Sequence, residues 1–150
     1  MATSTVALGA SEVAAALGLS PWTSPYELWA RKTGRLTTQK ESDALEAGTR
    51  LEPAIIDWAE SVIGRIERPV EAAIDGTPIV THPDGLTEAG CPVEAKTSGI
   101  TGPLYGTWGE EWTDEIPEHY LVQCLVQLEA TGGEACFVPA LLGGRGFTMF

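Results

Sequence analysis

The stretch from Pro83 to Thr97 constrains the fold of this chain more than any other, because it is typical of a hairpin that ends in a half-buried strand. Side chains alternate between the two faces of a strand, so Glu94 and Lys96 share one face and Ala95 points to the other. Asp84 lies ten positions before Glu94, and the glycine-containing segment between them is short enough to fold back. We therefore expect two carboxylates and a lysine to meet at one sheet edge.

Charges in this arrangement suit a hard divalent cation, which prefers oxygen ligands, with Lys96 near an attacking water. A glutamate and a lysine on one strand face are also common as a solvated pattern of surface charges. From this stretch alone, the solvated pattern is the stronger interpretation. The remainder of the chain has to decide between the two.

Length and composition indicate one domain over residues 1–150. A chain of 150 residues buries about 68–70% of its unfolded surface and needs no disulfide or structural metal to fold. No apolar run approaches the roughly 20 residues that span a bilayer, so we expect a soluble, cytoplasmic protein with no membrane partner. The cysteines, Cys91, Cys124 and Cys136, form no CxxC pair and are expected to be buried, reduced thiols.

The net charge of −12 argues against nucleic-acid binding, because proteins that bind nucleic acids usually carry a basic surface. The positive charge is nevertheless concentrated locally, since Arg31, Lys32, Arg35 and Lys40 lie close together in the sequence. We interpret the first three of these residues as a candidate DNA-binding surface.

Capping residues predict two short helices near the N-terminus. Ser11 is a suitable N-cap for the alanine-rich segment that ends at Gly18. Ser24 caps the second helix, which has Pro25 at its first position and ends at Gly34.

The longest helical pattern runs from Glu41 to about Ile63, with apolar residues at helical spacing. It leaves two interpretations of Glu52. If the helix includes this residue, Glu52 projects from the apolar face and needs a cation or hydrogen bonds. If the helix begins near Pro53, Glu52 is an exposed acid that interacts favourably with the helix dipole.

A last helix is predicted from Pro117 to about Ala130. Its apolar residues are expected to form the core face: Leu121, Cys124, Leu125 and Leu128. A separate polar stripe at positions i, i+3 and i+7 consists of Tyr120, Gln123 and Gln127. Taken alone, that stripe indicates solvent exposure.

The remaining segments predict strands. Two are expected over residues 66–74 and 77–81 around an Asp75-Gly76 turn, and two more over residues 135–142 and 146–150 around Gly143-Gly144. Residues 98–115 are expected to form a long loop. The element order predicts a compact α/β domain with a mixed central sheet flanked by helices.

Several motifs resemble, in their order along the chain, the YqaJ-type viral recombinase family, to which the lambda exonuclease is related. They are Gly9-Ala10-Ser11-Glu12-Val13, Ser24-Pro25-Tyr26-Glu27-Leu28-Trp29 with Lys32-Thr33-Gly34, Gly48-Thr49-Arg50-Leu51-Glu52-Pro53, Pro83-Asp84-Gly85-Leu86, Glu94-Ala95-Lys96, and Ile116-Pro117 with Tyr120, Gln123 and Gln127. The motifs around Asp84 and Glu94 are similar to the PD-(D/E)XK nuclease signature. The resemblance covers residues 9–150 and implies a restriction-endonuclease-like core.

This resemblance implies a Mg²⁺-dependent deoxyribonuclease, with Mn²⁺ as a substitute, that resects double-stranded DNA ends in the 5′–3′ direction for phage-type recombination. It implies metal ligands at Glu52, Asp84, Glu94 and the backbone carbonyl of Ala95. It also implies roles for Lys96 at the nucleophilic water, for Tyr120 and Gln123 in supporting the site, and for Ser11 near the terminal 5′ phosphate. Relatives further imply a ring of three subunits and a single-strand annealing protein as a partner.

Two departures from the family pattern leave other functions open. Residues 1–8 hold no arginine, which relatives carry before the Gly-x-Ser segment, at the 5′-phosphate pocket. The chain also stops at Phe150, where relatives continue, so C-terminal elements of the family are expected to be missing. The alternatives are a related endonuclease or repair nuclease, and a non-catalytic remnant of the fold that binds DNA or protein.

Overall fold

The computed structural model describes residues 6–37, 42–99 and 106–150. The helices of these residues are α1 (Ala10–Ala16), α2 (Pro25–Lys32), α3 (Asp43–Ile63) and α4 (Glu118–Thr131). The strands are β1 (Ile66–Glu67), β2 (Ala72–Ala73), β3 (Val80–Thr81), β4 (Gly85–Thr87), β5 (Pro92–Val93), β6 (Lys96–Ser98), β7 (Pro139–Leu142) and β8 (Phe147–Met149). None of the described helices is long and apolar enough to cross a membrane.

A mixed sheet forms the centre of the fold. Strands β1, β4 and β5 pair antiparallel in that order, and β7 lies between β6 and β8, parallel to the first and antiparallel to the second. A parallel bridge between Val93 and Phe137, and a 2.9 Å hydrogen bond from Glu94 N to Phe137 O, join the two groups of strands. The predicted α/β domain with a mixed central sheet is therefore confirmed.

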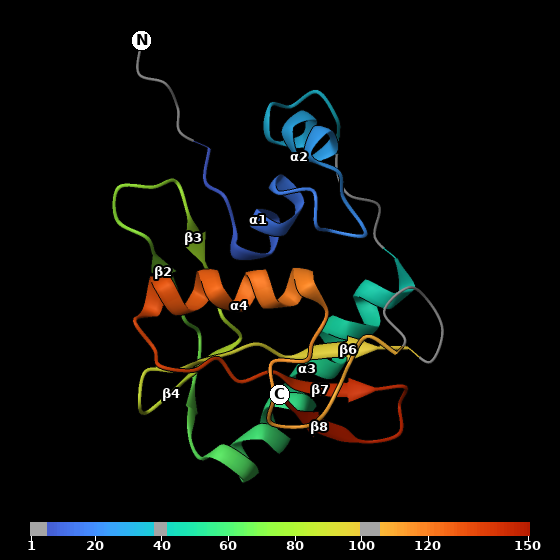
Figure 1. Cartoon of the computed structure of the whole chain (residues 1–150), viewed down its shortest axis with the longest axis vertical. Helices are drawn as coiled ribbons and strands as arrows, with labels where there is room; N and C mark the ends of the chain where they lie inside the picture. Colours follow the sequence, from blue (N-terminus) through green and yellow to red (C-terminus); the bar gives the residue numbers. More distant parts are fainter. Residues whose placement is uncertain (1–5, 38–41, 100–105) are drawn as a thin grey trace.

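Helices α3 and α4 contribute to separate apolar clusters against this sheet. In one cluster, Ile56 of α3 packs with Val93, and Phe137 packs against them. In the other, Cys124 of α4 packs with Val138. Neighbouring residues of an extended segment point in opposite directions. Phe137 therefore packs against the cluster of α3, and Val138 packs in the cluster of α4. In Figure 1, α1 and then α2 lie beyond α4, on the side away from β6, β7 and β8.

Helix α3 continues through Pro53, so Glu52 lies inside it, and the alternative start near Pro53 is wrong. Ser42 caps the helix and Gly64 ends it with a φ of 89°. Proline has no N–H to donate to the preceding turn, which removes one helical hydrogen bond. Tertiary packing compensates for that loss, because Ile56, three residues after the proline, is fully buried.

The start of α1 differs from the prediction. Gly9, rather than Ser11, is the N-cap, and the Glu12 carboxylate accepts the Gly9 N–H at 2.8 Å. A side chain within the first turn thus satisfies a backbone donor at the helix start, and Ser11 lies exposed in that turn. Helix α2 begins directly after Ser24, as its capping pattern predicts.

The strand predicted over residues 66–74 is divided into β1 and β2. Pro69 lies between them and cannot donate a backbone hydrogen bond to a neighbouring strand. Strands β2 and β3 still form the predicted antiparallel pair, with Gly76 at a φ of 75° in their turn. Strands β7 and β8 pair through Gly143 and Gly144, whose φ values of 61° and 65° are typical of a type I′ turn.

The loop predicted over residues 98–115 begins one residue later, because Ser98 belongs to β6. Its residues 100–105 lie outside the described residues, as do Lys40 and Glu41.

Candidate active site

Glu94 and Lys96 lie on the face of the sheet that α4 covers. They flank Ala95, which packs against the cluster that contains residues of α3, as strand alternation requires. Glu94 is 6% exposed, and Lys96 Nζ lies 2.8 Å from Glu94 Oε1. The solvated charge pattern is therefore excluded, because this is a buried pair, and a buried charge needs partners.

Two glutamines of α4 supply the other partners of Glu94. Gln123 Nε2 donates to Glu94 Oε1 at 2.6 Å, and Gln127 Nε2 donates to Glu94 Oε2 at 2.6 Å. Lys96 Nζ donates to Gln123 Oε1 at 3.1 Å. The exposure indicated by the polar stripe alone is thus wrong, and so is the predicted burial of Leu125, which is 57% exposed. Helix α4 turns its amide groups inward because they satisfy a carboxylate that is removed from water.

The ammonium group of Lys96 is held in its charged form. Burial lowers the pKa of Lys96, but attraction to Glu94 and the hydrogen bond with Glu94 outweigh this effect, so the pKa lies above its ordinary value. Lys96 Nζ also lies 4.6 Å from the centre of the Tyr120 ring. Burial raises the pKa of the Tyr120 hydroxyl. At neutral pH the site therefore presents a fixed positive charge and a protonated phenol.

Asp84 lies immediately before β4 and contacts the segment that carries Glu94 and Lys96. Its Oδ2 accepts the backbone N–H of Ala95 at 2.8 Å. Burial, followed by the Glu94 and Glu52 carboxylates, raises the pKa of Asp84 to about 7, although the Ala95 hydrogen bond and Lys96 act in the opposite direction. The raised pKa thus reflects removal of the carboxyl group from water first and repulsion by the neighbouring carboxylates second.

Glu52 contributes to this repulsion from α3. Gly48, one helical turn before Glu52, lies next to β6. A Cβ atom added to Gly48 would stand 3.4 Å from Thr97 Oγ1, so α3 passes close to this strand. Glu52 itself is half-buried and adds to the negative potential at Asp84. Glu52, which the sequence predicts as a site residue, therefore lies near enough to Asp84 to raise its pKa.

The residues around Asp84 fit a divalent cation by charge and by ligand type. Their carboxylates supply the oxygen atoms that Mg²⁺ prefers, and a cation would offset the surplus negative charge. Among the described residues, no three histidine, cysteine, aspartate or glutamate side chains form a ready group of metal ligands. The ligands predicted from the sequence are Glu52, Asp84, Glu94 and the backbone carbonyl of Ala95, and both carboxylate oxygen atoms of Glu94 already accept hydrogen bonds.

The predicted DNA-binding residues lie on α1 and α2 or just after them, outside the hydrogen-bond network of Glu94. Lys32 Nζ forms a 2.6 Å ion pair with Glu12 Oε2 and donates to Ala7 O at 2.8 Å. These contacts connect α2 to α1 and to the N-terminal segment. Lys32 therefore has a structural role in addition to the role predicted for it.

Three more residues surround the catalytic candidates. Of these three, Gln127 belongs to the polar stripe of the sequence, since it lies one helical turn after Gln123. The His119 ring centre lies 4.0 Å and the Trp108 ring centre 5.8 Å from that of Tyr120. Burial and the Lys96 charge lower the pKa of His119, which favours its neutral form. No sequence signal marks Trp108, because it comes from a loop without periodicity.

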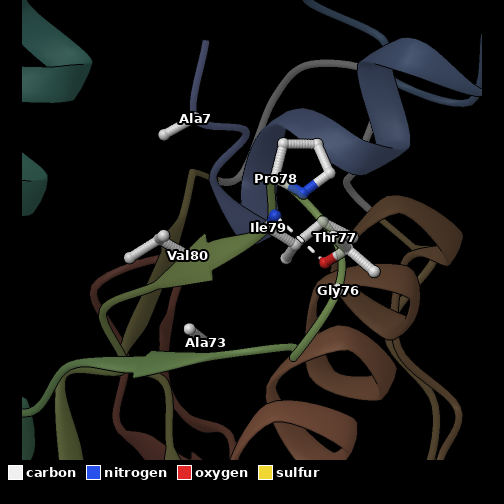
Figure 2. A pocket seen from close by; sticks show the side chains of 7 residues that line it. All are labelled: Ala7, Ala73, Gly76, Thr77, Pro78, Ile79 and Val80. Carbon is white, nitrogen blue, oxygen red and sulfur yellow. Dashed lines mark hydrogen bonds between the residues drawn. The ribbon is translucent and has the colours of Figure 1, made fainter. Parts of the chain in front are cut away.

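A pocket lies away from this network, between the N-terminal segment and the β2–β3 hairpin (Figure 2). It has a volume of about 420 Å³ and is lined by Ala7, Ala73, Gly76, Thr77, Pro78, Ile79 and Val80. The Ile79 N–H donates to Thr77 Oγ1 at 3.2 Å. The lining is largely apolar and includes none of the charged candidates, so it offers no catalytic group.

The mixed sheet, with Asp84 just before β4, Glu94 just after β5 and Lys96 at the start of β6, has the restriction-endonuclease-like fold of PD-(D/E)XK nucleases. The crystal structure of an alkaline exonuclease (LHK-Exo) from Laribacter hongkongensis matches with a TM-score of 0.68 and 20% sequence identity, over 97% of this chain and 76% of that chain. The structure of LHK-Exo in complex with dAMP matches with a TM-score of 0.69 over the same shares. These similarities establish the fold.

The chain belongs to the family of the YqaJ-like viral recombinase domain, whose description matches residues 3–134. The uncharacterized protein YqaJ of Bacillus subtilis (strain 168) is 30% identical over 154 residues, which cover 93% of this chain and 44% of that protein. The chain therefore spans less than half the length of this relative.

Proposed function

We propose that this protein is a Mg²⁺-dependent deoxyribonuclease that degrades double-stranded DNA from its ends in the 5′–3′ direction. The observation that carries this proposal is the arrangement of Asp84, Glu94 and Lys96, in which surplus carboxylate charge lies beside a buried, charged ammonium group. Family membership supports the same chemistry. The related alkaline exonuclease has been solved with dAMP, which supports a deoxyribonucleotide product.

The carboxylates of Glu52, Asp84 and Glu94, with the Ala95 carbonyl, are the proposed ligands of Mg²⁺, for which Mn²⁺ would substitute. When bound, the cation supplies positive charge that stabilises the developing negative charge on the scissile phosphate. The raised Asp84 pKa fits this assignment, since a bound cation would offset both the burial and the repulsion that favour the protonated carboxyl group.

Lys96 acts in this proposal as a hydrogen-bond donor rather than as a base. Its pKa is raised by Glu94, so a proton is held more tightly than on an ordinary lysine. A preorganised ammonium group can orient the attacking water and stabilise phosphate charge. Gln123 positions Lys96 by a hydrogen bond, and Tyr120 by the contact of its ring with the ammonium group.

DNA contacts outside the catalytic centre are proposed for Ser11, Arg31, Lys32 and Arg35. We also propose that residues 1–150 act as a single nuclease domain in the cytoplasm. Three copies in a ring would retain DNA by enclosing it, so that few phosphate contacts are needed despite the net charge of −12. A single-strand annealing protein is the proposed partner in recombination.

Digestion of labelled linear duplex DNA tests the function. Parent protein with Mg²⁺ should release a 5′ label as mononucleotide early and a 3′ label late, and EDTA or Asp84→Ala should abolish both. A covalently closed plasmid should remain intact. Nicking of the plasmid would favour the endonuclease alternative, and no Mg²⁺-dependent loss of any DNA would favour the non-catalytic remnant.

A further inference from the structure

Helix α2 and the turn before it expose three large aromatic side chains. Trp22 is 59% exposed, Tyr26 69% and Trp29 47%. The same helix buries Leu28 and Ala30 at 5% and 2% exposure. An aromatic side chain offers more apolar area for burial than alanine does, so this helix keeps its largest apolar surfaces outside. Such a surface is commonly an interaction site.

The aromatic residues are ordered by contacts with one another and with a cation. Tyr26 and Trp29 are three positions apart on the helix and therefore neighbours on one face. Their ring centres lie 5.6 Å apart, with 37° between the ring planes. The Arg35 guanidinium lies 4.6 Å above the centre of the Trp29 ring. We name Trp22, Tyr26, Trp29 and Arg35 the aromatic face.

The turn that carries Trp22 is fixed relative to the helix. The Trp22 N–H donates to Ser20 Oγ at 3.2 Å, and Arg31 Nη2 donates to Thr23 Oγ1 at 3.1 Å. Because these contacts hold the turn in place, presenting the ring of Trp22 requires little further ordering of its backbone.

The charge of this segment differs from that of the whole chain. Residues 13–37 contain one acid, Glu27, and three bases, Arg31, Lys32 and Arg35, whereas the whole chain carries a net charge of −12. Glu12, one position before this segment, pairs with Lys32, so the segment together with this acid has one more positive than negative charge. It is complementary to a polyanion, while most of the protein would repel one.

We propose that the aromatic face binds single-stranded DNA, with bases stacked on its exposed rings and Arg35 close to the phosphates. Aromatic side chains combined with arginine are a sequence-tolerant mode of binding single strands, because every base has a flat face. A duplex keeps its bases stacked internally and does not offer these faces along its length. The inference rests on the proposed function, since an exonuclease that degrades one strand leaves the other strand single.

Binding is measured in EDTA, so that no cleavage occurs, by the fluorescence anisotropy of a labelled thymidine oligonucleotide of about 20 residues. Trp22→Ala and Tyr26→Ala should each weaken binding about 5- to 100-fold, in accord with the free energy of stacking one base. Trp112→Ala is the matched control, because Trp112 is 58% exposed on a different segment, and it should bind like the parent. Trp29→Phe, which retains a ring, should bind more tightly than Trp29→Ala.

The salt dependence separates stacking from charge. Arg35→Gln should reduce the slope of log affinity against log salt concentration by about 0.7, whereas Tyr26→Ala should leave the slope unchanged. Circular dichroism and thermal unfolding identify any variant that has lost its fold. Tyr26→Ala removes the most exposed ring and serves as the second variant if Trp29→Ala unfolds.

Parent-like affinity for the oligonucleotide in folded Trp22→Ala and Tyr26→Ala would overturn the inference. A lower molecular mass of these variants in light scattering, with unchanged DNA binding, would instead identify the aromatic face as a contact between copies of the chain. Parent protein that binds the oligonucleotide but never cleaves duplex DNA would refute only the proposed function. Cleavage by the parent, with variants that bind like it, would refute only this inference.

Discussion

Asp84 and Ala95 are joined by a hydrogen bond of 2.8 Å from the Ala95 N–H to Asp84 Oδ2. The donor belongs to the residue between Glu94 and Lys96, so this contact fixes the position of one carboxylate relative to the other and to the ammonium group. The hydrogen bond favours the charged form of Asp84, yet burial and the neighbouring carboxylates outweigh it.

Asp84→Asn should stabilise the metal-free protein at high pH and not at low pH. The pKa of Asp84 is raised to about 7 in the folded state, compared with about 3.9 in an unfolded chain. The stabilising contribution of the protonated carboxyl group is complete below pH about 4 and is lost as the pH rises through about 7. Asparagine does not ionise, so the free energy of unfolding of the variant should exceed that of the parent by up to about 4 kcal/mol at pH 8.

Urea unfolding in EDTA at pH 4 and at pH 8 measures this difference. Asp75→Asn, at an exposed turn position, is the control and should differ little from the parent at either pH. An Asp84→Asn variant that is less stable than the parent at pH 8 would contradict the pKa assignment.

Asp84→Ala and Lys96→Ala should both eliminate cleavage but should differ in metal binding. Asp84→Ala removes a proposed ligand and should weaken Mg²⁺ binding by more than about tenfold. Lys96→Ala removes a positive charge that repels the cation, so its Mg²⁺ affinity should equal or exceed that of the parent. Calorimetric titration of chelator-treated protein at pH 8 compares them, and equal affinities for all three proteins would refute the ligand role of Asp84.

Gln127→Leu should destabilise the fold, although it replaces a polar residue in the interior with an apolar one. Gln127 is fully buried and donates to Glu94 Oε2. Removing a donor from a buried charged group costs about 1–3 kcal/mol. Denaturant unfolding should show this loss, whereas Leu125→Ala, at an exposed position of the same helix, should change stability by less than about 0.5 kcal/mol.

Lys32 and Glu12 should show energetic coupling in a double-mutant cycle. Their 2.6 Å ion pair is partly exposed, so the coupling energy is expected to be about 0.5–1 kcal/mol. Thermal unfolding of Glu12→Ala, Lys32→Ala and the double variant measures it. If the single effects simply add, the ion pair does not connect α2 to α1 energetically, and an effect of Lys32→Ala on DNA binding would then not arise from the loss of its contact with Glu12.

The alternation of Glu94, Ala95 and Lys96 was predictable because a strand imposes a period of two wherever it lies. Ser24 and the Gly143-Gly144 turn were predictable for a similar reason, since capping and turn preferences depend on adjacent residues. Each of these features is local. The structure adds the environment that decides whether the charges are solvated or buried.

The inward face of α4 could not be predicted from its apolar residues. Leu125 is exposed while Gln123 and Gln127 are buried, because the two amides bond to Glu94, 29 and 33 positions away. A hydrophobic pattern records affinity for an apolar interior and does not identify a distant carboxylate. The N-cap at Gly9 was missed for a related reason, since Ser11 has a favourable side chain but the Glu12 carboxylate reaches the free backbone donor.

The placement of Ala95 between Glu94 and Lys96 makes the site more sensitive to a change in chain length than to many substitutions. Deletion of this one small residue would shift every later position of the strand to the opposite face. The ammonium group of Lys96 would then enter the apolar layer formed by Ile56 and Val93, and Thr97 would face Gln123. A frame-preserving loss of three nucleotides would thus eliminate the proposed reaction while leaving every charged residue of the protein in the gene product.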